Sequence, residues 1–103
     1  MNRAESLYST LRAGGLDFFL SVPCKLLGDL IKKLEADPAI IHTPVSREEE
    51  GVGMACGAYL AGRRPAIVMQ NSGFGNSVNA ILALLNYYKV PVTFVVSHRG
   101  TDG

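Results

Sequence analysis

The sequence contains no tryptophan, only two cysteines and no excess of charge of either sign. Ten lysines and arginines against nine aspartates and glutamates leave a formal net charge of +1. This balance excludes the basic surplus typical of nucleic-acid binding, and it excludes an acidic tail. Cys24 and Cys56 lie far apart and form no CxxC motif, which argues against both a zinc site and a disulfide framework.

Long apolar runs are missing as well. No uninterrupted apolar stretch reaches the roughly 18 residues that a membrane span needs, and residues 1–6 lack the apolar core of a signal peptide. The apolar fraction of 48% is nevertheless too high for a disordered chain. We therefore expect a small globular domain in the cytoplasm, with no membrane or nucleic-acid partner and no metal site of its own.

Charge is scarce in one stretch of the chain. Between Pro65 and Val96 the only charged residue is Lys89. Such a stretch either lies at the centre of a sheet covered on both faces or forms part of an interface with another chain.

Apolar runs that read as strands alternate with stretches of helical periodicity. Helices are predicted at residues 3–13, 25–36, 46–61 and 76–88, and strands at 18–22, 40–45, 66–70 and 92–96. Continuous apolar strands that alternate with helices predict an α/β fold, an open parallel sheet with helices on both faces. Because few residues follow the last strand, we expect residues 1–103 to be a single, incomplete domain, truncated after its fourth strand.

The segment from Ser46 to Tyr59 combines three consecutive glutamates with three glycines. Acidic residues at a helix start complement the helix dipole, and Ser46 with Glu49 fits a capping box. On pattern alone this structural interpretation is the stronger one. The glycines at positions 51, 53 and 57 lower helix propensity, however, and such a helix usually lets another helix or a ligand approach closely.

Three further candidate segments follow predicted strands. Residues 71–76, Asn-Ser-Gly-Phe-Gly-Asn, form a glycine-rich turn that matches neither the dinucleotide fingerprint nor a Walker A loop, and a capped tight turn explains it equally well. Lys25 follows the first strand, and His98 and Arg99 follow the last; each fits an ordinary surface position too. Because parallel strands end at one edge of the sheet, we expect all these segments to share that edge.

Together these motifs resemble the pyrimidine-binding domain of thiamine-diphosphate enzymes. The resemblance is carried by Glu49-x-Gly51-x-Gly53-x-Ala55-x-x-Ala58-Tyr59, by the strand and the turn 71–76 that follow, and by Ser21-Val22-Pro23. Within this superfamily, segments 46–53, 69–77 and 97–100 are most similar to the alpha subunits of sulfopyruvate decarboxylases. Phosphonopyruvate decarboxylases have a similar central segment.

The resemblance implies roles for particular residues. In these enzymes a glutamate meets N1′ of the cofactor's aminopyrimidine, and the spacing to Tyr59 assigns this catalytic role to Glu49. Thiamine diphosphate is then expected to contact Glu49, Asn71, Ser72, Gly73, Phe74 and Asn76. The reaction implied is loss of CO2 from 3-sulfopyruvate to give sulfoacetaldehyde. Because this substrate is a dianion, cations should bind it, and the candidates are Lys25, His98 and Arg99.

One motif of these enzymes is absent, the Gly-Asp-Gly with a downstream Asn that holds the diphosphate through Mg²⁺. The resemblance therefore implies a separate beta subunit that binds the diphosphate and Mg²⁺, a hetero-oligomer with paired alpha chains, and activity only with that partner. Two alternatives stay open: a phosphonopyruvate decarboxylase, and a non-catalytic subunit that binds partners through the glycine-rich helix. A nucleotide-binding module is disfavoured by the failed loop fingerprints.

Overall fold

The computed structural model describes residues 2–22, 27–70, 81–86 and 88–97. The elements in chain order are α1 (Arg3–Ala13), β1 (Phe18–Ser21), α2 (Gly28–Ala36), β2 (Ile41–Pro44), α3 (Glu48–Leu60), β3 (Pro65–Gln70), the π-helix η2 (Ile81–Asn86) and β4 (Thr93–Ser97). The predicted strands are confirmed to within one residue at each end. The predicted starts of two helices, at residues 25 and 76, lie outside the described residues.

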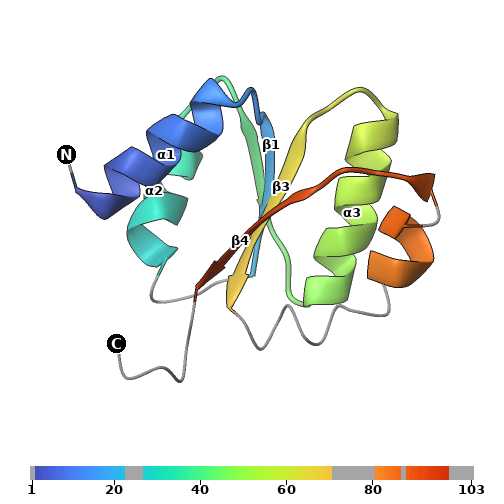
Figure 1. Cartoon of the computed structure of the whole chain (residues 1–103). Coiled ribbons are helices and arrows are strands. Elements are labelled where there is room, and N and C mark those ends of the chain that lie inside the picture. Colours follow the sequence, from blue (N-terminus) through green and yellow to red (C-terminus); the bar gives the residue numbers. More distant parts are fainter. Residues whose placement is uncertain (1, 23–26, 71–80, 87, 98–103) are drawn as a thin grey trace.

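The described strands form one parallel sheet in the order β2-β1-β3-β4. Ser21, the last residue of β1, is in register with Pro44 of β2 and with Val68 of β3, and Gln70 of β3 is in register with Ser97 of β4. The strands therefore end at a common edge, here named the carboxyl edge. It lies toward the lower part of Figure 1, where α3 begins.

Helices cover both faces of this sheet, α1 and α2 on one side and α3 and η2 on the other (Figure 1). Alternate strand residues enter two separate cores. Phe19 and Val68 pack with Leu34 of α2, whereas Leu20 and Ile67 face the α3 side. This two-sided burial explains the continuous apolar strands and confirms the predicted open parallel sheet with helices on both faces.

The uncharged stretch of the chain has two structural environments. In β3, flanked by β1 and β4, residues 65–69 are all buried. In β4, at the end of the described sheet, the residues are half-buried or exposed, and Tyr88 before it is 55% exposed. The sheet interior thus accounts for β3, whereas Tyr88 and the residues of β4 leave uncharged surface open on either side of the exposed Lys89.

The described helices are short. None of them is long and apolar enough to cross a lipid bilayer. The cytoplasmic location expected from the sequence stays a prediction.

Candidate functional site

The first turn of α3 lies at the carboxyl edge of the sheet, to the side of the strand ends (Figure 1). Arg47 is the N-cap, with extended backbone at φ −135° and ψ 145°. Gly51 lies against the sheet, because a Cβ placed on it would be 3.5 Å from Cγ2 of Val45 and 3.7 Å from Cγ2 of Ile67. The first turn of α3 therefore packs against Val45, which follows β2, and against Ile67 of β3.

Two of the three glutamates of this turn, Glu49 and Glu50, have different partners. Glu50 accepts a hydrogen bond from the Arg47 backbone N–H at 3.0 Å, the carboxylate half of a capping box. The expected capping box between Ser46 and Glu49 is wrong, because the helix starts later and Arg47 is the N-cap residue. The guanidinium of Arg47 has no acceptor atom with which to complete the box. Glu50 therefore caps the N-terminal end of α3, and Glu49 takes no part in this capping.

Glu49 presents an accessible carboxylate. Its side chain is 51% exposed, and its Oε2 lies 3.3 Å from Nη2 of Arg47, which is itself 69% exposed. Exposed pairs of this kind contribute only about 0–1 kcal/mol, so Glu49 can exchange this partner for another at little cost. One turn further along the helix, no atom of the described residues lies within 4 Å of a Cβ placed on Gly53. A carboxylate beside an open glycine surface fits a flat heterocycle with a basic ring nitrogen, as in the aminopyrimidine of thiamine diphosphate.

The other predicted site residues lie outside the described part of the chain. They are Lys25, Asn71, Ser72, Gly73, Phe74, Asn76, His98 and Arg99. The strands before them, β1, β3 and β4, end at the same carboxyl edge from which α3 starts. The shared edge is therefore confirmed for the described strand ends, and the contacts of these eight residues stay predictions.

The sequence interpretation missed a polar cluster near this edge, on the α2 side of the sheet, in which the Ser21 and His42 side chains are buried and the Glu35 side chain is 59% exposed. Oγ of Ser21, a residue only 1% exposed, lies 2.8 Å from Nε2 of His42. The His42 side chain is 4% exposed, and its Nδ1 lies 3.9 Å from Oε1 of Glu35. Burial lowers the pKa of His42 below its ordinary value, and the Glu35 carboxylate opposes this by raising it. The available signal was a titratable residue inside a predicted strand.

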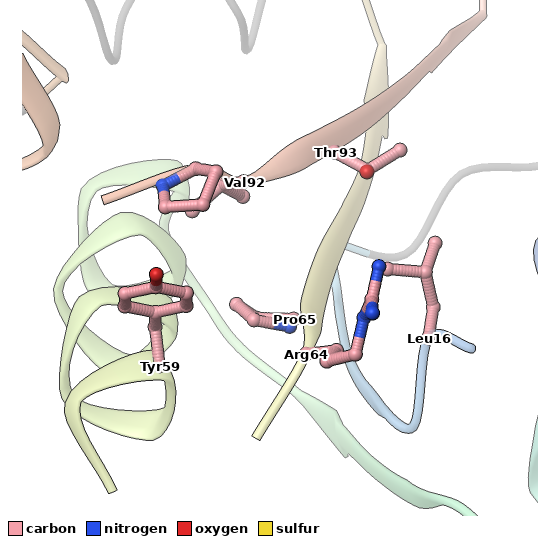
Figure 2. Close-up of a pocket in the computed structure, with 7 residues that line it drawn as sticks. Leu16, Tyr59, Arg64, Pro65, Val92 and Thr93 are labelled. Carbon is pink, nitrogen blue, oxygen red and sulfur yellow. The ribbon is translucent and has the colours of Figure 1, made fainter. Parts of the chain in front are cut away.

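A pocket of about 430 Å³ lies at the opposite, amino edge of the sheet. Figure 2 shows the Tyr59 ring near the end of α3 and the Arg64 guanidinium on either side of Pro65, with Val92 and Thr93 of the β4 segment above them. Glu49, the one predicted site residue in the described part of the chain, does not line this pocket. Because α3 runs from the carboxyl edge to the amino edge, the pocket is at the far end of the helix from Glu49 and is not the candidate site.

Metal-binding groups are sparse in residues 2–22, 27–70, 81–86 and 88–97. No three His, Cys, Asp or Glu side chains are grouped there so that they could hold a metal ion. Cys56 is a free thiol, buried in the core on the α3 side. The Mg²⁺ that the resemblance assigns to a partner subunit stays a prediction.

A parallel sheet covered on both faces, with an accessible glutamate in the first turn of a glycine-rich helix at its carboxyl edge, defines a cofactor-binding α/β domain. Residues 1–103 match the family described as thiamine pyrophosphate enzyme, N-terminal TPP binding domain. The chain belongs to this family.

The chain is similar to the alpha subunits of two sulfopyruvate decarboxylases. It is 50% identical over 103 residues to sulfopyruvate decarboxylase subunit alpha of Methanothermobacter thermautotrophicus, covering 100% of this chain and 62% of the relative. It is 50% identical over 100 residues to the same subunit of Methanococcus maripaludis, covering 97% and 60%. The chain thus spans about three fifths of the length of these relatives.

A more distant relative is phosphonopyruvate decarboxylase of Streptomyces viridochromogenes, 34% identical over 100 residues, which cover 97% of this chain and 25% of the relative. Among solved structures, 2-oxoglutarate:ferredoxin oxidoreductase from Magnetococcus marinus superposes with a TM-score of 0.76 at 18% identity, covering 100% of this chain and 18% of that one. At this identity the structural likeness supports the fold alone.

Proposed function

We propose that this chain is the pyrimidine-binding part of a thiamine-diphosphate-dependent decarboxylase that converts 3-sulfopyruvate to sulfoacetaldehyde and CO2. The observation that carries the proposal is the first turn of α3. There Glu50 caps the helix, while Glu49 is exposed beside open space at Gly53. Identities of 47–50% to three sulfopyruvate decarboxylase alpha subunits support the choice of substrate. Residues 1–103 belong to a single domain in this proposal.

The proposal assigns separate roles to the residues that contact the cofactor and to those that bind the substrate. Glu49 shares a proton with N1′ of the pyrimidine and so holds that ring in its reactive tautomer. When bound, thiamine diphosphate supplies the thiazolium that accepts the electron pair left behind as CO2 departs. The residues proposed to line the cofactor are Asn71, Ser72, Gly73, Phe74 and Asn76. Lys25, His98 and Arg99 are proposed to bind the two anionic groups of the substrate.

A beta subunit completes the proposed site by binding the diphosphate through Mg²⁺. The names of the relatives support this, since those from Methanothermobacter thermautotrophicus and Methanococcus maripaludis are each a subunit alpha. The surface of α3 supports it too. No charged residue occurs from Gly51 to Gly62, yet Met54 and Leu60 are 41% and 66% exposed. An uncharged surface of this kind is typical of an interface, and we propose a hetero-oligomer with paired alpha chains.

Phosphonopyruvate decarboxylation is the second candidate, because the relative from Streptomyces viridochromogenes shares 34% of its residues with this chain over the aligned region. Both substrates are keto acids with a carboxylate and a second anionic group, a sulfonate or a phosphonate, and the same residues would bind them. The two candidates differ in the anionic group at C3 and in no other respect that bears on the mechanism.

The test is release of CO2 from 3-sulfopyruvate by the alpha chain at its natural length, co-expressed with its beta partner and supplied with thiamine diphosphate and Mg²⁺. We expect release only when both chains are present. Release of CO2 from phosphonopyruvate but not from 3-sulfopyruvate would identify phosphonopyruvate as the substrate. An assembled complex that decarboxylates neither acid would reject the enzymatic role and favour a non-catalytic subunit.

A further inference from the structure

The proposed reaction has no use for the buried pair of Ser21 and His42, or for Glu35 beside it, whose side chain is 59% exposed. Ser21 ends β1, His42 lies on β2, and Glu35 lies on α2. Nε2 of His42 is 2.8 Å from the Ser21 hydroxyl, and Nδ1 is 3.9 Å from the Glu35 carboxylate. The order matches that of a hydrolase triad. Ser21 is only 1% exposed, however, so no substrate reaches its hydroxyl and it is not a nucleophile.

Ser21 is also joined to the backbone that leads into α3. Its carbonyl accepts a hydrogen bond from the Val45 N–H at 2.8 Å, and Val45 stands two residues before the N-cap Arg47. The Val45 side chain in turn lies against Gly51 in the first turn of α3. Contacts therefore run without a break from the His42 ring through Ser21 and Val45 to the turn that carries Glu49.

The hydrogen bond between Ser21 and His42 depends on both side chains and on the protonation state of the His42 ring. Both side chains are buried, so removing one leaves the other without its partner. With a neutral ring whose Nε2 is unprotonated, the Ser21 hydroxyl donates to His42; a doubly protonated ring donates instead, and the hydroxyl must turn to accept. Among the described residues, the polar groups that face the ring are Ser21 from β1 and Glu35 from α2.

We propose that Ser21 and His42 are positioning residues: with a neutral imidazole, their hydrogen bond fixes the carboxyl ends of β1 and β2 and thereby places the first turn of α3 and Glu49. The inference rests on the decarboxylase function proposed above. It assigns to this pair a part in the rate of the chemical step and none in binding the keto acid.

The test compares Ser21→Ala, His42→Leu and His42→Gln in the alpha chain assembled with its beta partner. Leucine fills much of the space of the ring without a hydrogen bond, whereas the glutamine amide keeps a hydrogen bond and does not titrate. We expect Ser21→Ala and His42→Leu to lower kcat about tenfold with little change in KM for sulfopyruvate, because misplacement of a catalytic group affects the chemical step. We expect the wild-type kcat to decline at acid pH as the His42 ring is protonated, and His42→Gln to keep most of the wild-type kcat without that decline.

Two results would overturn the inference. One is a set of variants that unfold more easily but keep the wild-type kcat and pH profile, since the pair would then be structural alone. The other is a His42→Gln variant with an unchanged acid limb. If Ser21→Ala does not assemble, the pH profile of His42→Gln decides. If the wild-type complex decarboxylates neither keto acid, the proposed function fails instead. In that case the affinity for thiamine diphosphate, measured by calorimetry, tests the inference. We expect His42→Leu to bind the cofactor more weakly than His42→Gln does. Equal affinities would overturn the inference.

Discussion

Glu49 differs from its acidic neighbour Glu50 in what its carboxylate does. Glu50 caps the N-terminal end of α3 by accepting from the Arg47 N–H, whereas Glu49 pairs, among the described residues, with the exposed guanidinium of Arg47. Because the two carboxylates lie in the same helical turn but have different partners, substitutions of Glu49 and Glu50 can be compared as a matched pair.

We predict that Glu49→Gln lowers kcat by about 10²- to 10⁴-fold, because an amide cannot share a proton with a ring nitrogen as a carboxyl group does. Glu50→Gln is the control. Its amide oxygen can still accept from Arg47, so we expect near wild-type turnover and stability. Steady-state decarboxylation by the assembled complex measures both, and equal losses in the two variants would contradict the assignment of Glu49.

Lys25 is predicted to bind the second anionic group of the substrate. Lys25→Ala should raise KM for sulfopyruvate about tenfold or more, the size expected for a charge-assisted hydrogen bond, and raise KM for pyruvate far less. Lys32→Ala removes an exposed lysine from α2 and serves as the control, with both constants unchanged. Equal increases for the two keto acids after Lys25→Ala would reject this role.

Lys89 has a left-handed backbone, with φ 58°, after the π-helix η2. A residue with a Cβ is strained there and glycine is not. We predict that Lys89→Gly raises the free energy of unfolding by up to about 1 kcal/mol, since the gain is partly offset by the greater entropy of glycine in the unfolded chain. Lys89→Ala removes the same charge but keeps the Cβ. Urea denaturation that shows the same gain for both variants would assign the effect to charge and not to the backbone.

At the scale of elements, the end of α2 is tied to α1 by one carboxylate. Asp37 Oδ2 accepts from the Tyr8 hydroxyl at 2.5 Å and from Nε of Arg12 at 3.1 Å, and Oδ1 accepts from the Ala39 N–H at 2.9 Å. The hydrogen bond from Tyr8, followed by the one from Ala39, lowers the pKa of Asp37 below its ordinary value. The same bond to Asp37 raises the pKa of Tyr8.

A lowered pKa in the folded state gives the stability contribution of Asp37 a definite pH dependence. The contribution is fully present above the ordinary pKa of 3.8 and is lost as the pH falls through the lowered folded value. Asp37→Asn should therefore unfold at lower urea than wild type at pH 7, and the difference should shrink as the solution is acidified below 3.8. Asp29→Asn, at an exposed acid in the first turn of α2, is the control. A difference that stays constant with pH would contradict this origin.

The elements also show what sequence could and could not predict. Strands β1 and β3 were predictable because each is a continuous apolar run bounded by Gly or Pro. The start of α3 was not, because Ser46 and three glutamates allow two capping registers, and the Val45 contacts with Ser21 and Gly51 fix the backbone before the helix. The bond between Ser21 and His42 depends on the register of β1 against β2, which residues 21 apart in sequence do not reveal.

At the scale of the whole molecule, the sequence predicted the layers of the fold, because two-sided burial of β3 requires helices on both faces. For the candidate site, the sequence predicted that the strands end at a common edge, because this follows from a parallel sheet. The arrangement of groups around a bound cofactor did not follow, because in the proposed assembly a second chain completes that site.

We predict that Met54→Asp disrupts assembly, because it places a charge on the exposed, uncharged surface of α3. Gly53 and Gly57 leave open space beside it. The dissociation constant should rise about tenfold or more, as for residues central to an interface. Ile41→Asp, at another exposed apolar residue on β2 (39% exposed), is the control and should assemble as wild type. Mass measurement by light scattering distinguishes these outcomes, and a fully assembled Met54→Asp complex would place the interface elsewhere.

The connection between β2 and α3 is short, with only Val45 and Ser46 between the last strand residue Pro44 and the N-cap. Each residue of an α-helix turns the following side chain by about 100°. One residue inserted or deleted ahead of the helix would therefore rotate the acids around the axis and turn Glu48 or Glu50 toward the direction that Glu49 now takes. Natural variation in this family should then tolerate substitutions in the connection far better than changes in its length.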